Sequence, residues 1–149
     1  MQLCHRDIKL ENFILINKRK LNIKLIDFGL AKKLEDGKKI YGKPVGTPYY
    51  IAPELLLGES DCKSDVWSAG VILYMLLTGK PLYDGLTDKD IIFNIKNEQP
   101  NFGSKEFQTL SESCQDLLKK LLDKNPYLRI TATEALDHPW ITSSYLKTP

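Results

Sequence analysis

The sequence lacks a signal peptide and a membrane-spanning run. Its first residues, MQLCHRD, contain no apolar segment of the kind that a signal peptide needs, and the longest apolar run, Val71–Leu77, is too short to cross a bilayer. It also lacks an excess of charge, because 21 Lys and Arg residues face 19 Asp and Glu residues for a net charge of +2. We therefore predict no nucleic-acid partner and no membrane partner.

Cysteine and histidine are scarce. The three cysteines, Cys4, Cys62 and Cys114, are odd in number and show no CxxC spacing. This pattern argues against a disulfide framework and against a zinc site, and it predicts reduced thiols in a cytoplasmic or, alternatively, nuclear protein. The only histidines, His5 and His138, leave few ligands for a transition metal.

The composition that is present is typical of one folded unit. The chain has 149 residues, of which 42% are hydrophobic and 27% are charged, and this is enough for one domain with a real core. We find no internal repeat, low-complexity tract or linker. Residues 1–149 are therefore expected to form a single domain.

Two short β-rich runs, Phe13–Ile16 and Ile23–Ile26, flank a polar turn and predict a hairpin. Residues 27–54 are rich in glycine and proline and show neither helical nor alternating periodicity. A loop of this length in a compact domain is usually functional or disordered. We therefore expect an irregular segment directly after the hairpin.

Helices dominate the remainder of the chain. Residues 65–77 are apolar nearly all round, which predicts a buried helix that Gly79 and Pro81 terminate. Three further helices are predicted to begin near Thr87, Ser111 and Thr131. The predicted fold class is mainly α with one small β-hairpin.

The residues with the strongest chemical potential flank the hairpin. Because a hairpin returns the chain, Asn12 and Asp27 should meet at its open end. Their hard oxygen atoms suit Mg²⁺, and Asp7 lies five residues before Asn12 on the same loop. The alternative is that Asp7 and Asp27 are ordinary turn or cap residues.

Three motifs occur in a set order, and together they resemble the signature of protein kinases. They are HRD-x-K-x-x-N at residues 5–12, DFG at residues 27–29 and APE at residues 52–54. The resemblance extends from Leu3 to about Ile141. It implies the helical C-terminal lobe of the protein-kinase-like α+β fold, with the small β-hairpin next to the catalytic loop.

The resemblance also implies the reaction, which is transfer of the γ-phosphate of ATP to a Ser or Thr hydroxyl. Asp7 matches the catalytic Asp that accepts the hydroxyl proton, and Lys9 matches the lysine that meets the transferring phosphate. Asn12 and Asp27 match the positions that hold Mg²⁺ against ATP. Thr47 matches a threonine that hydrogen-bonds Asp7 and Lys9, and Lys9 together with the Gly-Thr-Pro at residues 46–48 resembles Ser/Thr kinases.

Further residues carry expected roles from the same resemblance. Ile14 and Ile26 match the apolar floor of the adenine pocket. Glu11 is counted with the ATP-facing residues and also matches a position that contacts an arginine in a basic substrate. Glu54 and Arg129 resemble a buried ion pair that fixes the activation segment. Asp65 resembles the Asp at a helix start that holds the catalytic-loop backbone near His5 and Arg6.

The stretch 30–46 contains no Ser or Thr that a regulatory kinase could phosphorylate. An arginine such as Arg6, directly before the catalytic Asp, often binds a phosphate on this loop. We hypothesise that Glu35 or Asp36 supplies a permanent negative charge instead. The chain ending RITATEALDHPWI (residues 129–141) resembles the calcium/calmodulin-dependent group, most of all its calcium-dependent protein kinases.

The sequence contains neither a Gly-rich phosphate loop nor a strand lysine of the V-A-I-K type. We therefore expect residues 1–149 to be a C-terminal lobe without its N-terminal ATP-binding lobe and to have negligible activity alone. No EF-hand motif is present in these residues, so a calcium sensor domain would belong to a longer protein. The alternatives are a non-catalytic kinase-lobe module that binds partners or serves as a scaffold, and a truncated gene model or expression clone.

Overall fold

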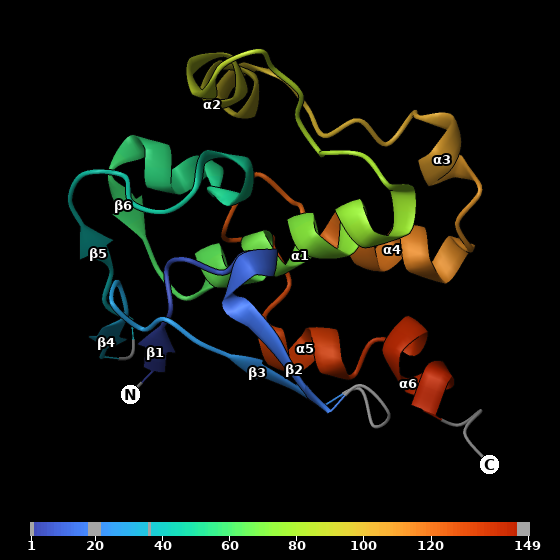
Figure 1. Ribbon diagram of the computed structural model, residues 1–149, viewed down its shortest axis with the longest axis horizontal. Coiled ribbons are helices and arrows are strands. Elements are labelled where there is room, and N and C mark those ends of the chain that lie inside the picture. Colours follow the sequence, from blue (N-terminus) through green and yellow to red (C-terminus); the bar gives the residue numbers. More distant parts are fainter. Residues whose placement is uncertain (1, 18–21, 36, 146–149) are drawn as a thin grey trace.

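The computed structural model describes residues 2–17, 22–35 and 37–145 as a helical body with short strands along one side (Figure 1). The helices are α1 (Lys63–Thr78), α2 (Asp88–Asn97), α3 (Lys105–Gln108), α4 (Glu112–Leu121), α5 (Ala132–Leu136) and α6 (Pro139–Tyr145). The strands are β1 (Gln2–Cys4), β2 (Phe13–Asn17), β3 (Asn22–Leu25), β4 (Lys32–Leu34), β5 (Ile40–Tyr41) and β6 (Glu59–Ser60). Short 3₁₀ turns are η1 (Leu10–Asn12), η2 (Pro48–Tyr50) and η3 (Pro53–Leu57). The predicted mainly helical fold class is confirmed.

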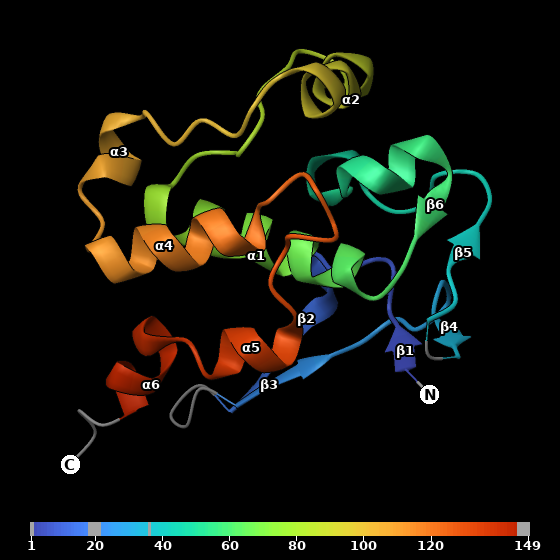
Figure 2. The same cartoon turned by 180° about the vertical axis from the view of Figure 1, so that it is seen from behind.

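Helix α1 is the centre of the core. Trp67, Val71 and Tyr74 are each at most 2% exposed, and the apolar side chains of α4 pack against them. Both views show α1 and α4 side by side (Figure 2). Gly70 permits this approach, because a Cβ atom there would lie 2.9 Å from the Cβ atom of Leu121.

The predicted helix starts are confirmed by their caps. Thr87 and Thr131 each form a capping box with an acidic side chain three residues later, and the Ser111 hydroxyl accepts a hydrogen bond from the Cys114 N–H. At the other end of α1, Gly79 adopts a left-handed conformation with φ of 69° and terminates the helix as predicted. None of the described helices is long and apolar enough to cross a membrane.

The predicted hairpin is confirmed as β2 and β3, which pair antiparallel with Phe13 opposite Leu25. Residues 18–21 of its connection lie outside the described residues. The expectation of an irregular segment at 27–54 is only partly right. β4 pairs with β1, and β5 pairs with β6, while η2 and part of η3 also fall in this stretch. Strands of two or three residues are too short to show an alternating pattern.

The expectation that the cysteines stay unpaired is wrong for two of them. Cys4 and Cys62 form a disulfide across a sequence separation of 58 residues, with their Cα atoms 4.8 Å apart. The tertiary fold brings the end of β1 against the start of α1, and no local sequence pattern reports that contact. Cys114 is a free, buried thiol, and its burial raises its pKa.

Candidate active site

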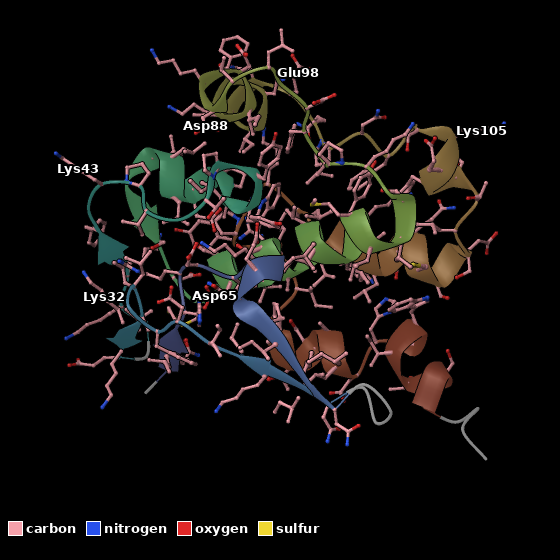
Figure 3. All side chains as sticks on the ribbon, in the orientation of Figure 1. Lys32, Lys43, Asp65, Asp88, Glu98 and Lys105 are labelled. Atoms are coloured by element: carbon pink, nitrogen blue, oxygen red, sulfur yellow. A yellow bond between two sulfur atoms is a disulfide. The ribbon has the colours of Figure 1, made fainter. Side chains whose placement is uncertain are left out.

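The loop that follows β1 is anchored by one carboxylate. Asp65, in the first turn of α1, accepts hydrogen bonds from the backbone N–H groups of His5 (2.6 Å) and Arg6 (2.8 Å). Figure 3 places Asp65 in the interior, whereas the labelled Lys32 and Lys43 extend outwards. Burial raises the pKa of Asp65, and the two N–H donors oppose that rise. The anchor holds Arg6 at a φ of 68°, a conformation that non-glycine residues seldom adopt.

Asp7, Lys9 and Thr47 form a closed polar cluster. The Lys9 Nζ lies 2.8 Å from Asp7 Oδ2 and donates to Thr47 Oγ1 at 3.1 Å, while the Thr47 hydroxyl donates to Asp7 Oδ1 at 3.3 Å. Asp7 and Lys9 side chains are 10% and 22% exposed, so the cluster is accessible but partly shielded. The hydrogen bond to Asp7 raises the pKa of Lys9, which keeps its ammonium charged. These three residues are among the four predicted catalytic residues, and the fourth, Asn12, also contacts Asp7.

Gly46 lets the segment that carries Thr47 lie against the catalytic loop. Its φ is 107°, and a Cβ atom there would lie 3.1 Å from the Arg6 carbonyl oxygen and 3.8 Å from Asp7 Oδ1. Any larger residue would therefore meet both an unfavourable backbone conformation and a close contact. This requirement was not predicted from the sequence.

Asn12, the fourth predicted catalytic residue, is tied to Asp7. Its buried side-chain nitrogen donates to the Asp7 carbonyl oxygen at 2.7 Å and lies 3.3 Å from Asp7 Oδ2. The Ile26 N–H donates to the Asn12 carbonyl oxygen at 2.9 Å. Asn12 therefore sits at the open end of the hairpin, directly opposite the residue that precedes Asp27, as the pattern predicts.

His5, on the loop that follows β1, holds the segment around Asp27 in place. His5 Nε2 donates to the Ile26 carbonyl oxygen at 3.1 Å, and its ring meets the Phe28 ring edge-on at 4.8 Å. Asp27 itself is exposed with a φ of 64°, and its Oδ1 accepts from the Gly29 N–H at 3.2 Å. Backbone strain of this kind concentrates at ligand sites and switches. The structural role of His5 was not foreseen from the sequence.

The Asn12 and Asp27 pair fits Mg²⁺ by its chemistry. With its nitrogen bound to Asp7, Asn12 presents its amide oxygen, and Asp27 adds an exposed carboxylate. Over the described ranges, no group of three or more His, Cys, Asp or Glu residues is placed to hold a metal ion. Mg²⁺ commonly takes only one or two protein ligands together with substrate phosphates, so two hard oxygen donors are consistent with it.

The other predicted ligand-facing residues lie nearby with different exposures. Ile14, on β2, is 47% exposed and pairs with Lys24 on β3, whereas Ile26 is half-buried. Glu11, in η1, is exposed. These placements leave their predicted roles as predictions.

The structure does not support Glu35 as a charge partner for Arg6. Arg6 Nε donates to the Leu30 carbonyl oxygen at 2.8 Å, and the Glu35 carboxylate pairs with Lys38 instead. Glu35 is therefore not an ion-pair partner of Arg6 among the described residues, and its role as a permanent charge stays a prediction. Asp36 lies outside the described residues.

Glu54 and Arg129 form the expected buried ion pair. Arg129 donates from both terminal nitrogens, at 2.7 and 2.8 Å, to the two Glu54 carboxylate oxygens. The Ser64 hydroxyl adds a third hydrogen bond to Glu54 at 2.8 Å, a contact that the sequence did not predict. The guanidinium also donates to the carbonyl oxygens of Lys63 and Asp123.

A comparison with known families decides what this arrangement belongs to. A model of the protein kinase domain matches residues 1–141. The chain belongs to the protein kinase family. It is 46% identical over 145 residues to calcium-dependent protein kinase 29 of Arabidopsis thaliana, covering 97% of this chain and 27% of that kinase. It is 45% identical over 139 residues to calcium-dependent protein kinase 3 of Plasmodium berghei, covering 93% of this chain and 25% of that kinase.

This kinase chain is most similar to the calcium-dependent group, as the ending at residues 129–141 indicates. Calcium-dependent protein kinase 19 of Oryza sativa is a further relative, 44% identical over 142 residues. The chain spans about a quarter of the length of the curated relatives it matches. Kinases of this family generally use ATP and Mg²⁺.

Proposed function

We propose that this chain is the catalytic-loop half of a protein serine/threonine kinase that transfers the γ-phosphate of ATP to a Ser or Thr hydroxyl. The observation that carries the proposal is the closed cluster of Asp7, Lys9 and Thr47, with Asn12 bound to Asp7. A turn or cap role for Asp7 does not account for a neighbouring lysine and a threonine from 40 residues later on the same carboxylate. This arrangement supports the proposal, because Asp7 can serve as a base beside the charged ammonium of Lys9.

Each residue of the cluster has a distinct task in this proposal. Asp7 accepts the proton of the substrate hydroxyl as the hydroxyl oxygen forms a bond to the γ-phosphorus of ATP, while the bond from that phosphorus to the bridging oxygen breaks and ADP leaves. Lys9 offsets the negative charge that builds up on the transferring phosphate. Thr47 holds the side chains of Asp7 and Lys9 in place through its hydrogen bonds to both. Asn12 and Asp27 would hold Mg²⁺, which neutralises phosphate charge when bound.

We propose that the 149 residues alone have negligible kinase activity. They contain no Gly-rich loop and no V-A-I-K lysine, and we infer that a separate ATP-binding lobe must complete the site. Four apolar side chains on the hairpin are 41–65% exposed, which supports a covering partner at this end of the chain. They are Ile14, Leu15, Ile16 and Ile23.

The proposed partners follow from the same comparison. The substrate is a protein with a Ser or Thr, and exposed Glu11 would favour a nearby arginine by charge attraction. The names of the relatives support a calcium sensor domain in a longer protein. We place the protein in the cytoplasm, with the nucleus as the alternative.

Phosphate transfer to a basic Ser/Thr peptide tests the proposal. The longer protein, with its ATP-binding lobe, should phosphorylate the peptide and require Mg²⁺, and Asp7→Asn should lower kcat at least about 10²-fold with intact folding. The matched control is Asp88→Asn, an exposed acid on α2, which should leave kcat unchanged. Full activity of Asp7→Asn would refute the assignment.

The second candidate is a non-catalytic kinase lobe that binds partners, and the exposed apolar side chains of the hairpin favour it. Under this alternative the longer protein binds its partners but transfers no phosphate, and Asp7→Asn has no effect. Transfer by the 149 residues alone, abolished by Asp27→Ala, would instead contradict our proposal that they are inactive.

A further inference from the structure

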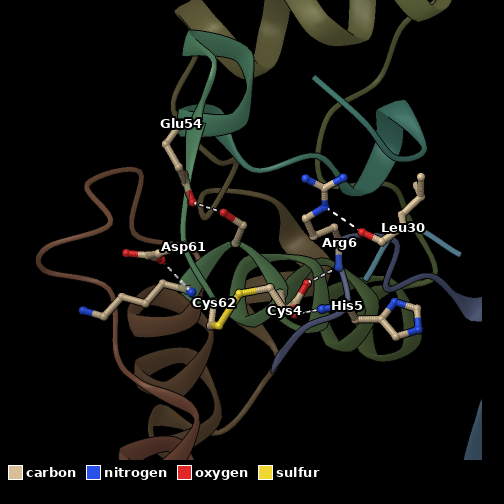
Figure 4. The surroundings of a disulfide bond; sticks show 10 residues. Cys4, His5, Arg6, Leu30, Glu54, Asp61 and Cys62 are labelled. Atoms are coloured by element: carbon tan, nitrogen blue, oxygen red, sulfur yellow. Dashed lines mark hydrogen bonds between the residues drawn. A yellow bond between two sulfur atoms is a disulfide. The ribbon is translucent and has the colours of Figure 1, made fainter. Parts of the chain in front are cut away.

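The Cys4–Cys62 disulfide joins the catalytic loop to the central helix. Cys4 is the last residue of β1 and directly precedes His5, and Cys62 is the N-cap residue of α1. Figure 4 shows the bond beside the backbone of His5 and Arg6. The disulfide is therefore one residue from the loop that carries Asp7.

The covalent link runs parallel to a non-covalent one. Asp65 lies three residues after Cys62. Its carboxylate accepts hydrogen bonds from the N–H groups of His5 and Arg6, the two residues that follow Cys4. Both links thus connect the same two short segments. When the disulfide is opened, the hydrogen bonds of Asp65 still keep the cysteines near each other, so the bond can form again without refolding of the chain.

The two cysteine residues differ in exposure. Cys4 is fully buried at 0% exposure, whereas Cys62 is partly exposed and lines a cavity of about 630 Å³. Lys63 lines the same cavity, and its ammonium donates to neutral carbonyl oxygens of Tyr127 (3.5 Å) and Arg129 (2.7 Å). Nearby positive charge favours a thiolate, which is the form that attacks disulfides.

The other two lysines on the wall of this cavity are already paired with carboxylates. Lys38 and Lys39 line it and pair with Glu35 and Glu59, and Asp61 also lines it. Lys63 forms no ion pair among the described residues, and the three lysines on the cavity wall outnumber its one acid, Asp61. A small anionic disulfide such as oxidised glutathione suits a cavity of this size and charge.

We propose that Cys4 and Cys62 form a reversible redox switch in which Cys62 is the entry thiol and Cys4 the resolving thiol. The Cys62 thiolate attacks one sulfur of glutathione disulfide, forming a mixed disulfide and releasing one glutathione thiolate. Cys4 then loses its proton and attacks the Cys62 sulfur, which releases the second glutathione. Two protein thiols are thereby oxidised, and one glutathione disulfide is reduced to two thiols.

The switch acts on the stability of the catalytic loop. A disulfide within a cytoplasmic protein is usually transient and redox-sensing, so this inference rests on the location that we propose above. Closing a loop of this length stabilises the folded chain, and the melting temperature of the oxidised form should be higher by roughly 10 °C. The amide hydrogens of His5 and Arg6 should exchange more slowly in the oxidised form.

Thiol trapping on the purified chain tests the switch without any kinase assay, so failure of phosphoryl transfer leaves it intact. The chain is equilibrated with glutathione and glutathione disulfide at several ratios, then alkylated and digested. The masses of the peptides that contain Cys4 and Cys62 are measured by mass spectrometry. We expect reversible formation of the disulfide, and a glutathione adduct on Cys62 in Cys4→Ser. Cys62→Ser should show no adduct on buried Cys4 and no redox dependence of melting.

Cys114→Ser is the matched control, because Cys114 is a free buried thiol away from the bond and its loss should leave the switch unchanged. Three results would overturn the proposal. They are a bond that excess reduced glutathione cannot open, redox-dependent melting that persists in Cys62→Ser, and equal glutathione labelling of Cys4 and Cys62 in the two single variants. If Cys4→Ser does not fold, Cys62→Ser alone decides between these outcomes.

Discussion

Replacing Arg129 with methionine should strongly destabilise the fold. The substitution leaves the Glu54 carboxylate, whose side chain is 8% exposed, with only the Ser64 hydroxyl among its described partners. It also removes a donor from the carbonyl oxygens of Lys63 and Asp123. Stranding one member of a buried ion pair costs about 3–5 kcal/mol. This is a large share of the roughly 5–15 kcal/mol that keeps a domain folded.

Urea denaturation measures this loss. The midpoint should fall while the m-value stays constant, and the melting temperature should drop by roughly 6–20 °C at about 2–4 °C per kcal/mol. Lys38→Met is the matched control, because Lys38 and its partner Glu35 are 67% and 71% exposed. An exposed pair of this kind contributes at most about 1 kcal/mol. If Arg129→Met lowers the urea midpoint no more than Lys38→Met does, the buried pair does not hold the segment that contains Glu54.

A double variant separates a lost attraction from a stranded charge. Glu54→Met with Arg129→Met removes both charges, and such apolar replacements are often neutral or stabilising. The double variant should therefore be more stable than Arg129→Met alone, although the Ser64 hydroxyl still loses its acceptor. A double variant that is less stable by the sum of both single losses would refute the stranded-charge explanation.

The other contacts give three further predictions. Asp65→Asn should cost about 1–3 kcal/mol and speed hydrogen exchange at the His5 and Arg6 amides, whose hydrogen bonds Asp65 accepts. Asp88→Asn, at an exposed position of α2, should change neither. Gly46→Ala should lower the melting temperature more than Gly37→Ala, since both glycines have positive φ but only Gly46 faces close contacts; equal losses would contradict this. The Thr131 backbone N–H lowers the pKa of Glu134 from 4.5, so its stabilising effect is present above pH 4.5 and is lost as the pH falls through the lowered value. The difference in melting temperature between wild type and Glu134→Gln should accordingly shrink from pH 7 to pH 3, and a constant difference would refute it.

Much of the candidate site was predictable because its parts are local in sequence or joined by a hairpin. Asp7, Lys9 and Asn12 occupy one loop, and the β2–β3 pairing necessarily returns the chain to Asp27. The caps at Thr87 and Thr131 were predictable for a similar reason, since the side chain and its target lie three residues apart. Contacts between residues that are close in sequence can therefore be predicted from local sequence patterns.

The contacts that escaped prediction span long separations. Cys4 meets Cys62 across 58 residues, and the β1–β4 pairing joins strands of three residues whose partner no periodicity identifies. Gly46 belongs to the glycine-rich stretch 27–54, but its close approach to the Arg6 carbonyl oxygen depends on two loops packing together. Such contacts are set by the tertiary fold, which local propensity does not encode.

The first turn of α1 connects all the segments on which the site depends. Cys62 and Asp65 hold the catalytic loop, and Ser64 holds Glu54 of the activation segment. The Lys63 carbonyl oxygen accepts from Arg129, which completes the buried pair. Because α1 packs at the centre of the core, these contacts hold the two loops at one place on its surface. The position of the Asp7, Lys9 and Thr47 cluster therefore depends on the N-cap residue and first turn of a helix outside it as well as on its own contacts.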